Sequence, residues 1–143
     1  GRAFDARRAP GYAPYAGLTF EVPTRTAGDV DARVWIRLDE ITQSLSIIEQ
    51  CLERLRDSPI TIAMDDALAA AAGREGTALV EGFRGDIFAW VQLGPAGTIA
   101  NAHIRDPSWL QWPLLEAAIE GNIVADFPLC NKSFNCSYSG HDL

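Results

Sequence analysis

A single apolar stripe in the first half of this 143-residue chain restricts its fold more than any other feature. The stripe consists of Val34, Leu38, Ile41, Leu45, Ile48, Leu52 and Leu55. Its spacing alternates between four and three residues, which is the period of one face of an α-helix. Asp29 or Asp31 can cap the start of this helix, and Ser58-Pro59 can end it. The stripe therefore predicts a helix over residues 29–57.

A second stripe runs along the same predicted helix and begins with polar residues. Its members are Arg37, Glu40, Ser44, Ile47 and Cys51. A helix lined on two faces is expected to pack on two sides, as helices do in a bundle. The chain contains no other helical pattern of this length. We therefore expect the partner helices in an absent N-terminal part or in another subunit.

The remaining patterns predict an α+β fold with short elements. Residues 1–28 are rich in Gly, Pro, Ala and Arg and form an extended lead-in with at most a short strand at 18–22, whereas 29–143 form one domain. The predicted elements are a short helix at 64–72, antiparallel strands at 77–83, 86–93 and 98–105, a helix at 113–120 and an irregular tail. The apolar run 87–91 predicts a strand that is covered on both faces.

Composition excludes several classes of protein. A net charge of −7 argues against a nucleic-acid partner, because phosphate contacts require a basic surface. No apolar run approaches the roughly 18 residues of a membrane span, and the polar first residues are not those of a signal peptide. We expect membrane contact only through a protein partner. The odd cysteine count, three, favours the reducing cytoplasm over a secreted disulfide scaffold.

The residues that could bind zinc are poorly spaced for it. Five residues separate Cys130 from Cys136, whereas a compact zinc site separates its cysteines by two to four. His103 and His141 are the only histidines, and no Ser-His-Asp arrangement or phosphate-binding glycine loop is present. We predict no metal site in this chain and no catalysis by these 143 residues alone.

Several short motifs occur in the order found in one protein family. They are 20–23 (FEVP), 28–30 (GDV), 37–41 (RLDEI), 81–86 (EGFRGD) and the tail from 107 to 143. With these motifs the chain resembles the C-terminal part of the D subunit of NADH:quinone oxidoreductase (complex I) and the nickel–iron hydrogenase large subunit. Among hydrogenases it is most similar to the hydrogenase-4-type membrane complexes.

The tail separates the two branches of this family. Hydrogenases end in a Ser-x-Asp-Pro-Cys-x-x-Cys pattern whose cysteines bind nickel. Aligned on Ser133, this chain has Ser137 and Gly140 at the two cysteine positions, Cys136 one position early, and Asn135 in place of the aspartate. The resemblance therefore implies that the metal site is lost.

The resemblance implies a role in respiratory electron transport. An iron–sulfur small subunit would pass electrons, ultimately from NADH, through the full-length subunit to a quinone-type acceptor. The chain itself would bind no cofactor and would lie in the cytoplasm, peripherally on the inner face of the cell membrane. Two alternatives remain open: a non-catalytic scaffold that docks an iron–sulfur subunit, and a hydrogenase large subunit with unusual metal ligands.

Five charged residues are predicted to line a polar cleft, although none is assigned a catalytic role. Arg84 matches the hydrogenase arginine that points at the metal centre, and the alternative is a structural ion pair with Glu81 or Asp86. Arg37 and Glu40 lie on one helical face, where an exposed pair contributes only about 0.2–0.5 kcal/mol. We expect them to be buried and bound to each other or to a partner.

Two tryptophans and a serine mark the start of the predicted helix at 113–120. Trp109 and Trp112 are predicted to anchor a core or an interface, because large aromatic side chains bury much apolar surface. Ser108 is predicted to be the N-terminal cap.

Overall fold

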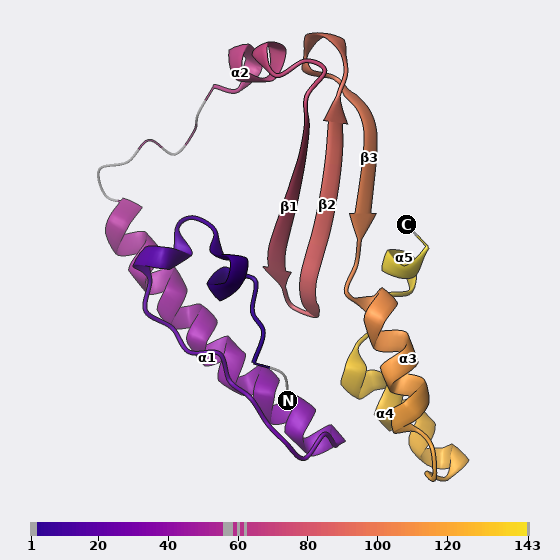
Figure 1. The fold of residues 1–143 in the computed structure, drawn as a ribbon. Coiled ribbons are helices and arrows are strands. Elements are labelled where there is room, and N and C mark those ends of the chain that lie inside the picture. Colours follow the sequence, from indigo (N-terminus) through magenta and orange to yellow (C-terminus); the bar gives the residue numbers. More distant parts are fainter. Residues whose placement is uncertain (1–2, 56–58, 60, 62, 143) are drawn as a thin grey trace.

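The computed structural model describes residues 3–55, 59, 61 and 63–142, and it confirms the α+β class. Figure 1 shows the long helix α1 beside the lead-in, a three-stranded sheet, and a helical C-terminal part on the far side of that sheet. The elements are α1 (Val30–Arg54), α2 (Asp65–Ala70), β1 (Glu75–Gly82), β2 (Gly85–Leu93), β3 (Ile99–Arg105), α3 (Ser108–Ala118), α4 (Phe127–Phe134) and α5 (Tyr138–His141). In the described part of the chain, no helix is both long and apolar enough to cross a membrane.

The predicted long helix is present and begins at the predicted cap. The carboxylate of Asp29 accepts a hydrogen bond from the backbone N–H of Ala32 at 2.8 Å, which satisfies one of the free N–H groups of the first turn. The helix ends at Arg54. The predicted stop at Ser58-Pro59 falls partly on residue 58, which lies outside the described residues.

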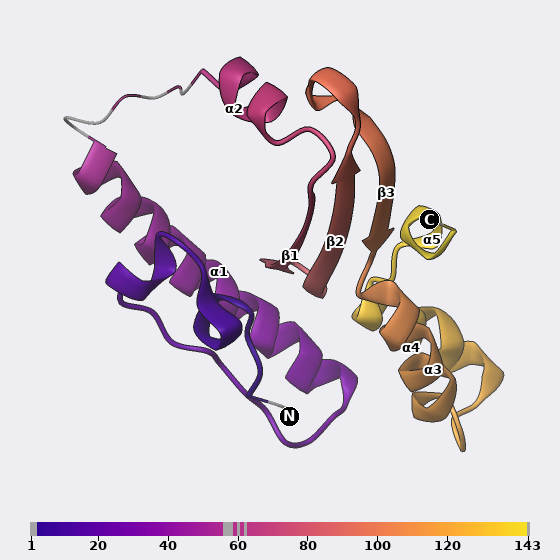
Figure 2. The same ribbon diagram turned by 45° about the horizontal axis from the view of Figure 1, so that its top comes forward.

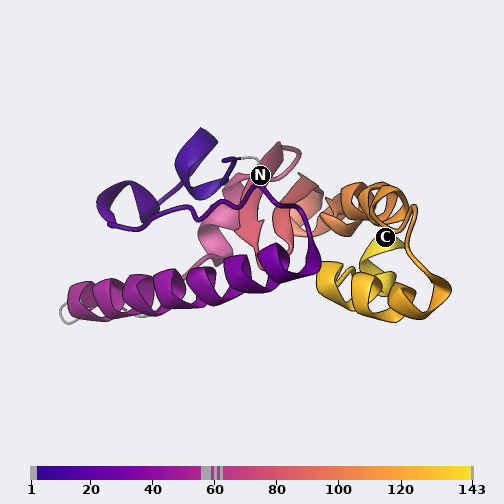
Figure 3. The ribbon, with the colours of Figure 1, turned by 90° about the horizontal axis from the view of Figure 1, so that it is seen from below.

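The two faces of α1 have opposite environments. Ile47 of the second stripe is buried, and Cys51 packs beside it. In contrast, every member of the apolar stripe is exposed, from 45% for Val34 to 60% for Leu52. The described chain thus packs against the partly polar stripe and leaves the apolar one open. Figure 3 shows the lead-in running along one side of α1.

The lead-in packs along α1 and forms a small core with it. Leu18 and Phe20 bury their side chains against Ile47. The predicted strand at 18–22 is wrong, because no strand among the described residues pairs with this segment. Side chains of α1 satisfy its backbone instead: Gln50 bonds both the N–H and the C=O of Thr19, at 2.8 and 2.7 Å.

The sheet is a simple antiparallel meander in the order β1-β2-β3. Its strands lie within two residues of their predicted bounds, and the predicted turn at 94–97 joins β2 to β3. A two-residue turn, Phe83-Arg84, joins β1 to β2. All of β2 is half-buried rather than covered. The covering that its apolar sequence predicts is therefore not provided by the described residues.

The helix predicted at 113–120 begins earlier, at Ser108. A carboxylate oxygen of Asp106 accepts the N–H of Ser108 at 2.8 Å and so initiates α3. Ser108 is therefore not the cap. Its hydroxyl accepts the backbone N–H of Ser137 at 2.8 Å and joins the tail to α3.

The tail is helical, and the prediction of an irregular tail was wrong. Phe127, Cys130 and Phe134 have helical spacing along α4, which contacts both α1 and α3. Asn135 ends α4 in the left-handed conformation, with φ of 54°. Figure 2 shows α4 and α3 side by side, with α5 near the open edge at β3.

Candidate functional site

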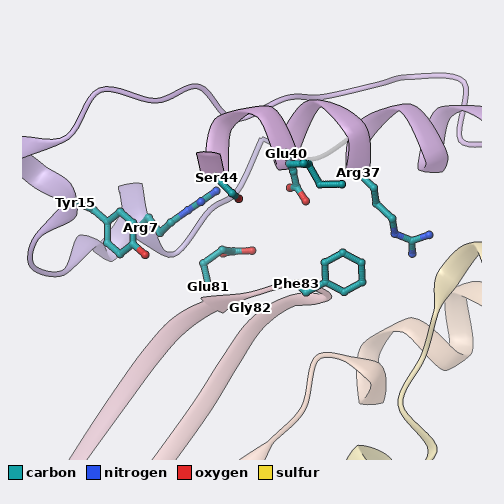
Figure 4. A pocket seen from close by; sticks show the side chains of 9 residues that line it. Arg7, Tyr15, Arg37, Glu40, Ser44, Glu81, Gly82 and Phe83 are labelled. Carbon is teal, nitrogen blue, oxygen red and sulfur yellow. The ribbon is translucent and has the colours of Figure 1, made fainter. Parts of the chain in front are cut away.

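The polar part of α1 faces the β1–β2 turn across a cleft of about 280 Å³. We call this the central cleft, which is lined by Arg7, Arg37, Glu40, Glu81 and Phe83 among others. Figure 4 shows Glu40 and Ser44 on α1 opposite Glu81 and Phe83, with Arg7 entering from the lead-in. The structure therefore brings three predicted site residues, Arg37, Glu40 and Glu81, to one place.

A second hollow of about 260 Å³ adjoins the central cleft on the side of the tail. We call it the arginine hollow, because Arg33, Arg37 and Arg84 line it together with Gln111 and Phe134. Arg37, Glu40 and Glu81 line both spaces. The fourth predicted residue, Arg84, thus lies in the same polar region.

Glu81 is the next-to-last residue of β1, and the lead-in binds its carboxylate. One carboxylate oxygen accepts the backbone N–H of Ala6 at 2.8 Å, and the hydroxyl of Tyr12 accepts the N–H of Glu81 at 3.1 Å. Burial raises the pKa of Glu81, and the bond from Ala6 only partly offsets that rise. Glu81 therefore holds a proton to higher pH than an exposed glutamate.

Glu40, on the opposite wall of the central cleft, also has a raised pKa. Burial raises the pKa of Glu40, while the positive charges of Arg7 and Arg37 act in the other direction. Arg37 does not form the predicted ion pair with Glu40. Its guanidinium donates instead to the backbone carbonyl of Phe134 at 3.0 Å, so it binds the tail.

A charged pair from the lead-in borders the central cleft. The Nε of Arg7 donates to Asp5 at 2.9 Å, and Asp5 is only 4% exposed. Burial alone would raise the pKa of Asp5, but hydrogen bonds from Arg7 outweigh it and lower that pKa. The bond to Asp5 likewise raises the pKa of Arg7, which keeps a cation beside the two glutamates.

Arg84 sits at the tip of the β1–β2 turn and binds the tail. Its Nε donates to the carbonyl of Asn135 at 2.5 Å, and its own carbonyl accepts from the side chain of Gln111. Neither predicted ion pair forms, because Asp86 pairs with Arg105 instead and Glu81 binds the lead-in. Asp86 is thus the one predicted site residue that stabilises the sheet rather than lining the cleft.

Comparison with known proteins shows the family of this chain. Residues 1–142 match the family described as respiratory-chain NADH dehydrogenase, 49 Kd subunit. The chain belongs to this family. The resemblance to the D subunit of complex I is therefore confirmed.

Individual relatives carry the same name over a limited part of their length. The D subunit of NADH-quinone oxidoreductase from Acidothermus cellulolyticus is 32% identical over 88% of this chain and 38% of that protein. The corresponding protein of Salinibacter ruber is 31% identical over 88% of the chain and 34% of its own length. The chain thus spans little more than a third of the curated relatives it matches.

A solved structure matches the whole chain. A chain in the structure of the membrane-bound sulfane sulfur reductase, an archaeal respiratory membrane complex, superposes with a TM-score of 0.85 and 32% identity. The match covers 100% of this chain and 40% of the other. This agreement extends to the helical tail, where the sequence-based prediction was wrong.

The residues at the nickel-ligand positions do not fit a metal. The hydroxyl of Ser137 accepts the backbone N–H of Gly140 at 3.0 Å, and so it is already used to cap α5. At Gly140 an added Cβ would lie 2.6 Å from Cγ of Asp106. Within the described residues, no cluster of three or more His, Cys, Asp or Glu side chains could hold a metal ion.

The cysteines of the tail also have roles other than metal binding. Cys136 contacts the side-chain oxygen of Gln111 at 3.7 Å, and burial raises the pKa of its thiol. Cys130 is buried beside Arg33. A metal-binding cysteine must be deprotonated, and burial disfavours that form of Cys136.

Three residues that line these two spaces were not among the predicted site residues. Arg33 precedes Arg37 by one helical turn, so its spacing could have placed it on the same face. Gln111 joins Arg84 to Cys136, and Arg7 reaches the cleft from the lead-in. No local pattern marks these two, because both act across contacts between distant segments.

Proposed function

We propose that this chain contributes the acceptor-side cleft of a redox subunit in a membrane-associated respiratory complex. In this proposal an iron–sulfur partner subunit supplies electrons and a quinone-type molecule accepts them. This chain would lie in the part of the complex that is peripheral on the cytoplasmic face of the membrane. The observation that carries the proposal is the central cleft, where two glutamates with pKa values raised by burial face each other beside two arginines.

The chemistry of quinone reduction suits this cleft. A quinone takes up two electrons and two protons to become a quinol, so a site that reduces it must deliver protons as well as electrons. Glu40 and Glu81 have pKa values raised by burial, and each can donate a proton and be reprotonated. Arg7 and Arg37 would stabilise the negative charge that develops before protonation is complete.

The arginine at the β1–β2 turn would position the tail at this cleft. Arg84 bonds Asn135 and contacts Gln111, so it connects the sheet with both α3 and α4. We therefore assign it a positioning role. The iron–sulfur partner would dock where electrons can reach the acceptor, and no residue of this chain is proposed to bind its cluster.

Turnover of the complete complex with a soluble quinone tests the proposal. Arg84→Ala and Glu81→Gln should each lower kcat by at least tenfold in complexes that assemble normally. Arg25→Ala, which removes an exposed arginine paired with Asp39, serves as the control. Unchanged turnover with intact assembly would favour the scaffold alternative, in which the chain only docks an iron–sulfur subunit.

A sulfane-sulfur acceptor is a second candidate. It is favoured by the sulfane sulfur reductase structure, which matches all of this chain at a TM-score of 0.85. Cleavage of a sulfur–sulfur bond to two thiols also consumes two electrons and two protons, so the same glutamates would serve. Parallel assays of one preparation with a quinone and with a polysulfide would decide between the two acceptors.

A hydrogenase with unusual ligands is the least supported alternative. The place of one nickel ligand is filled by Asp106 against Gly140, and Ser137 is already hydrogen-bonded. Elemental analysis of the complete, active complex tests this alternative. Stoichiometric nickel would support it, and full activity without nickel would exclude it.

A further inference from the structure

Three guanidinium groups converge on the arginine hollow from two different elements. Arg33 and Arg37 come from α1, one helical turn apart, and Arg84 comes from the β1–β2 turn. They line a half-buried space of about 260 Å³. We propose that this hollow is a binding site for a small oxyanion, of the size and charge of phosphate or sulfate.

These three arginines form no direct ion pair among the described residues, although Glu40 and Glu81 line the same hollow. Arg7, Arg25 and Arg105 each form an ion pair, with Asp5, Asp39 and Asp86. Within the described residues, no such ion pair involves Arg33, Arg37 or Arg84. Among the described residues Arg8, Arg54 and Arg74 also lack an ion pair, but only Arg33, Arg37 and Arg84 line one hollow together.

Neutral acceptors hold the three arginines in place. Arg33 donates to the hydroxyl of Ser133 at 2.9 Å and lies over the ring of Phe134 at 4.2 Å. Arg37 and Arg84 donate to carbonyls at the end of α4, at 3.0 and 2.5 Å. These bonds orient the guanidinium groups, so an anion would meet preorganised donors and the entropic cost of binding would be reduced.

In the described part of the chain, nitrogens without a bond remain on Arg37 and Arg84, whereas each guanidinium nitrogen of Arg33 already donates, to Ser133, Gly28 and Cys130. A guanidinium has five N–H donors in a planar fork that matches an oxyanion. Arg84 uses only Nε as a donor, and Arg37 uses only one terminal nitrogen, among the described residues. The terminal nitrogens left over can form the paired, charge-assisted bonds typical of phosphate and sulfate sites.

The two acidic residues at the border of the hollow do not replace such a ligand. The carboxylate of Glu81 is bound to the backbone of Ala6, and Glu40 contacts the positive charges only at longer range. Burial lowers the pKa of Arg37, the charges of Arg33 and Arg84 add to that effect, and the charge of Glu40 offsets only part of it. A bound oxyanion would offset the cost of burying these positive charges and would reduce the repulsion between them. This argument does not depend on which molecule accepts the electrons.

Titration calorimetry of the complete polypeptide with inorganic phosphate at constant ionic strength tests the proposal. We expect one saturable site. Arg37→Gln and Arg84→Gln should weaken binding at least tenfold, and Arg37→Lys should weaken it less, because lysine keeps the charge but loses the planar fork. Arg25→Gln, which loses the same charge outside the hollow, should bind phosphate as the unchanged protein does.

Two results would overturn the proposal. Equal weakening by Arg25→Gln would mean that phosphate responds only to overall charge. Absence of saturable binding by both phosphate and sulfate would mean that another acidic group already neutralises the arginines in the complete protein.

A measurement on the unchanged protein avoids any loss of folding in the variants. Phenylglyoxal modifies accessible arginines, and mass spectrometry locates the adducts. Phosphate should protect Arg37 and Arg84 from modification while leaving Arg25 reactive. Equal reactivity of all three arginines with and without phosphate would contradict the proposed site.

Discussion

At the scale of single residues, position 140 in the tail has no room for a side chain, and glycine is the residue that fits there. Asp106 occupies the space that any Cβ at this position would need, at 2.6 Å, and it also initiates α3. The carbonyl of Gly140 accepts the indole N–H of Trp109 at 2.8 Å. One residue thus joins the end of the chain to α3 through backbone contacts alone.

Gly140→Ala is predicted to destabilise the protein. Overpacking of this kind typically costs about 1–3 kcal/mol, because neighbouring groups must shift. Urea unfolding of the complete polypeptide measures the effect. Gly76→Ala is the matched control, since nothing lies within 4 Å of its added Cβ. A loss no greater than in this control would show that Asp106 moves freely.

Glu81 is predicted to make stability depend on pH. Its pKa is raised in the folded state, chiefly by burial, so its contribution to stability is fully present below the unfolded value of about 4.3. That contribution is lost as pH rises through the folded pKa. Glu81→Gln should therefore gain stability relative to the unchanged protein as pH rises from the unfolded pKa of Glu81 to its higher folded pKa.

Unfolding curves measured between pH 4 and 8 on both proteins test this dependence. Glu53→Gln removes the same charge at an exposed position of α1 and controls for net charge. The contribution of Asp5 to stability depends on pH in the opposite direction. Its pKa is lowered in the folded state, so its contribution is lost as pH falls through the folded pKa. Parallel curves for Glu81→Gln and the unchanged protein would refute the prediction.

At the scale of elements, α1 connects the lead-in with the tail. Its glutamines bond the lead-in backbone, whereas its arginines bond the end of α4. Any change that shortens this helix at its start should loosen Arg33 and its contacts with α4. The N-terminal cap is therefore the position at which α1 can be tested.

Asp29→Ala is predicted to destabilise α1 by about 0.5–2 kcal/mol, because the N–H of Ala32 loses its acceptor. Asp29→Asn keeps an acceptor and should cost less. Thermal unfolding of the complete polypeptide, monitored by circular dichroism, compares these variants. Asp31→Ala, in the first turn, removes only a charge near the helix dipole and should cost about 0.3–1 kcal/mol. A loss in Asp29→Ala no greater than that in Asp29→Asn would contradict the cap assignment.

At the scale of the whole molecule, the apolar stripe of α1 forms a continuous exposed hydrophobic surface. Contiguous apolar patches of this kind promote association in water. The 143-residue chain produced by itself is predicted to self-associate. Leu38→Glu combined with Leu45→Glu should shift it towards monomer in sedimentation experiments, because both side chains are exposed.

The same substitutions should be harmful in a complete complex. If another helix covers the stripe there, two glutamates will impair its assembly. Thr42→Glu, at an exposed position between the two leucines, controls for added charge. A monomeric unchanged chain would show that the stripe alone does not drive association.

Local patterns predicted most of the elements but not all of them. The long helix and three strands repeat their periods over seven or more residues, which makes them visible in the sequence. The eight-residue α4 spans only about two helical turns and the four-residue α5 about one, too few repeats of the helical period for such a signal. They are stabilised by contacts with α1 and α3, and a sequence pattern does not report contacts of that kind.

By itself the sequence determined the period of each long element, the cap at Asp29, the order of the family motifs and the absence of cysteine at the nickel positions. Only the tertiary structure decided which face of α1 is open and which charges meet. Arg37 binds the end of α4 rather than Glu40, and Asp86 pairs with Arg105 rather than Arg84. The physical reason is that spacing defines the face on which a side chain lies. Its partner depends on which distant element packs against that face.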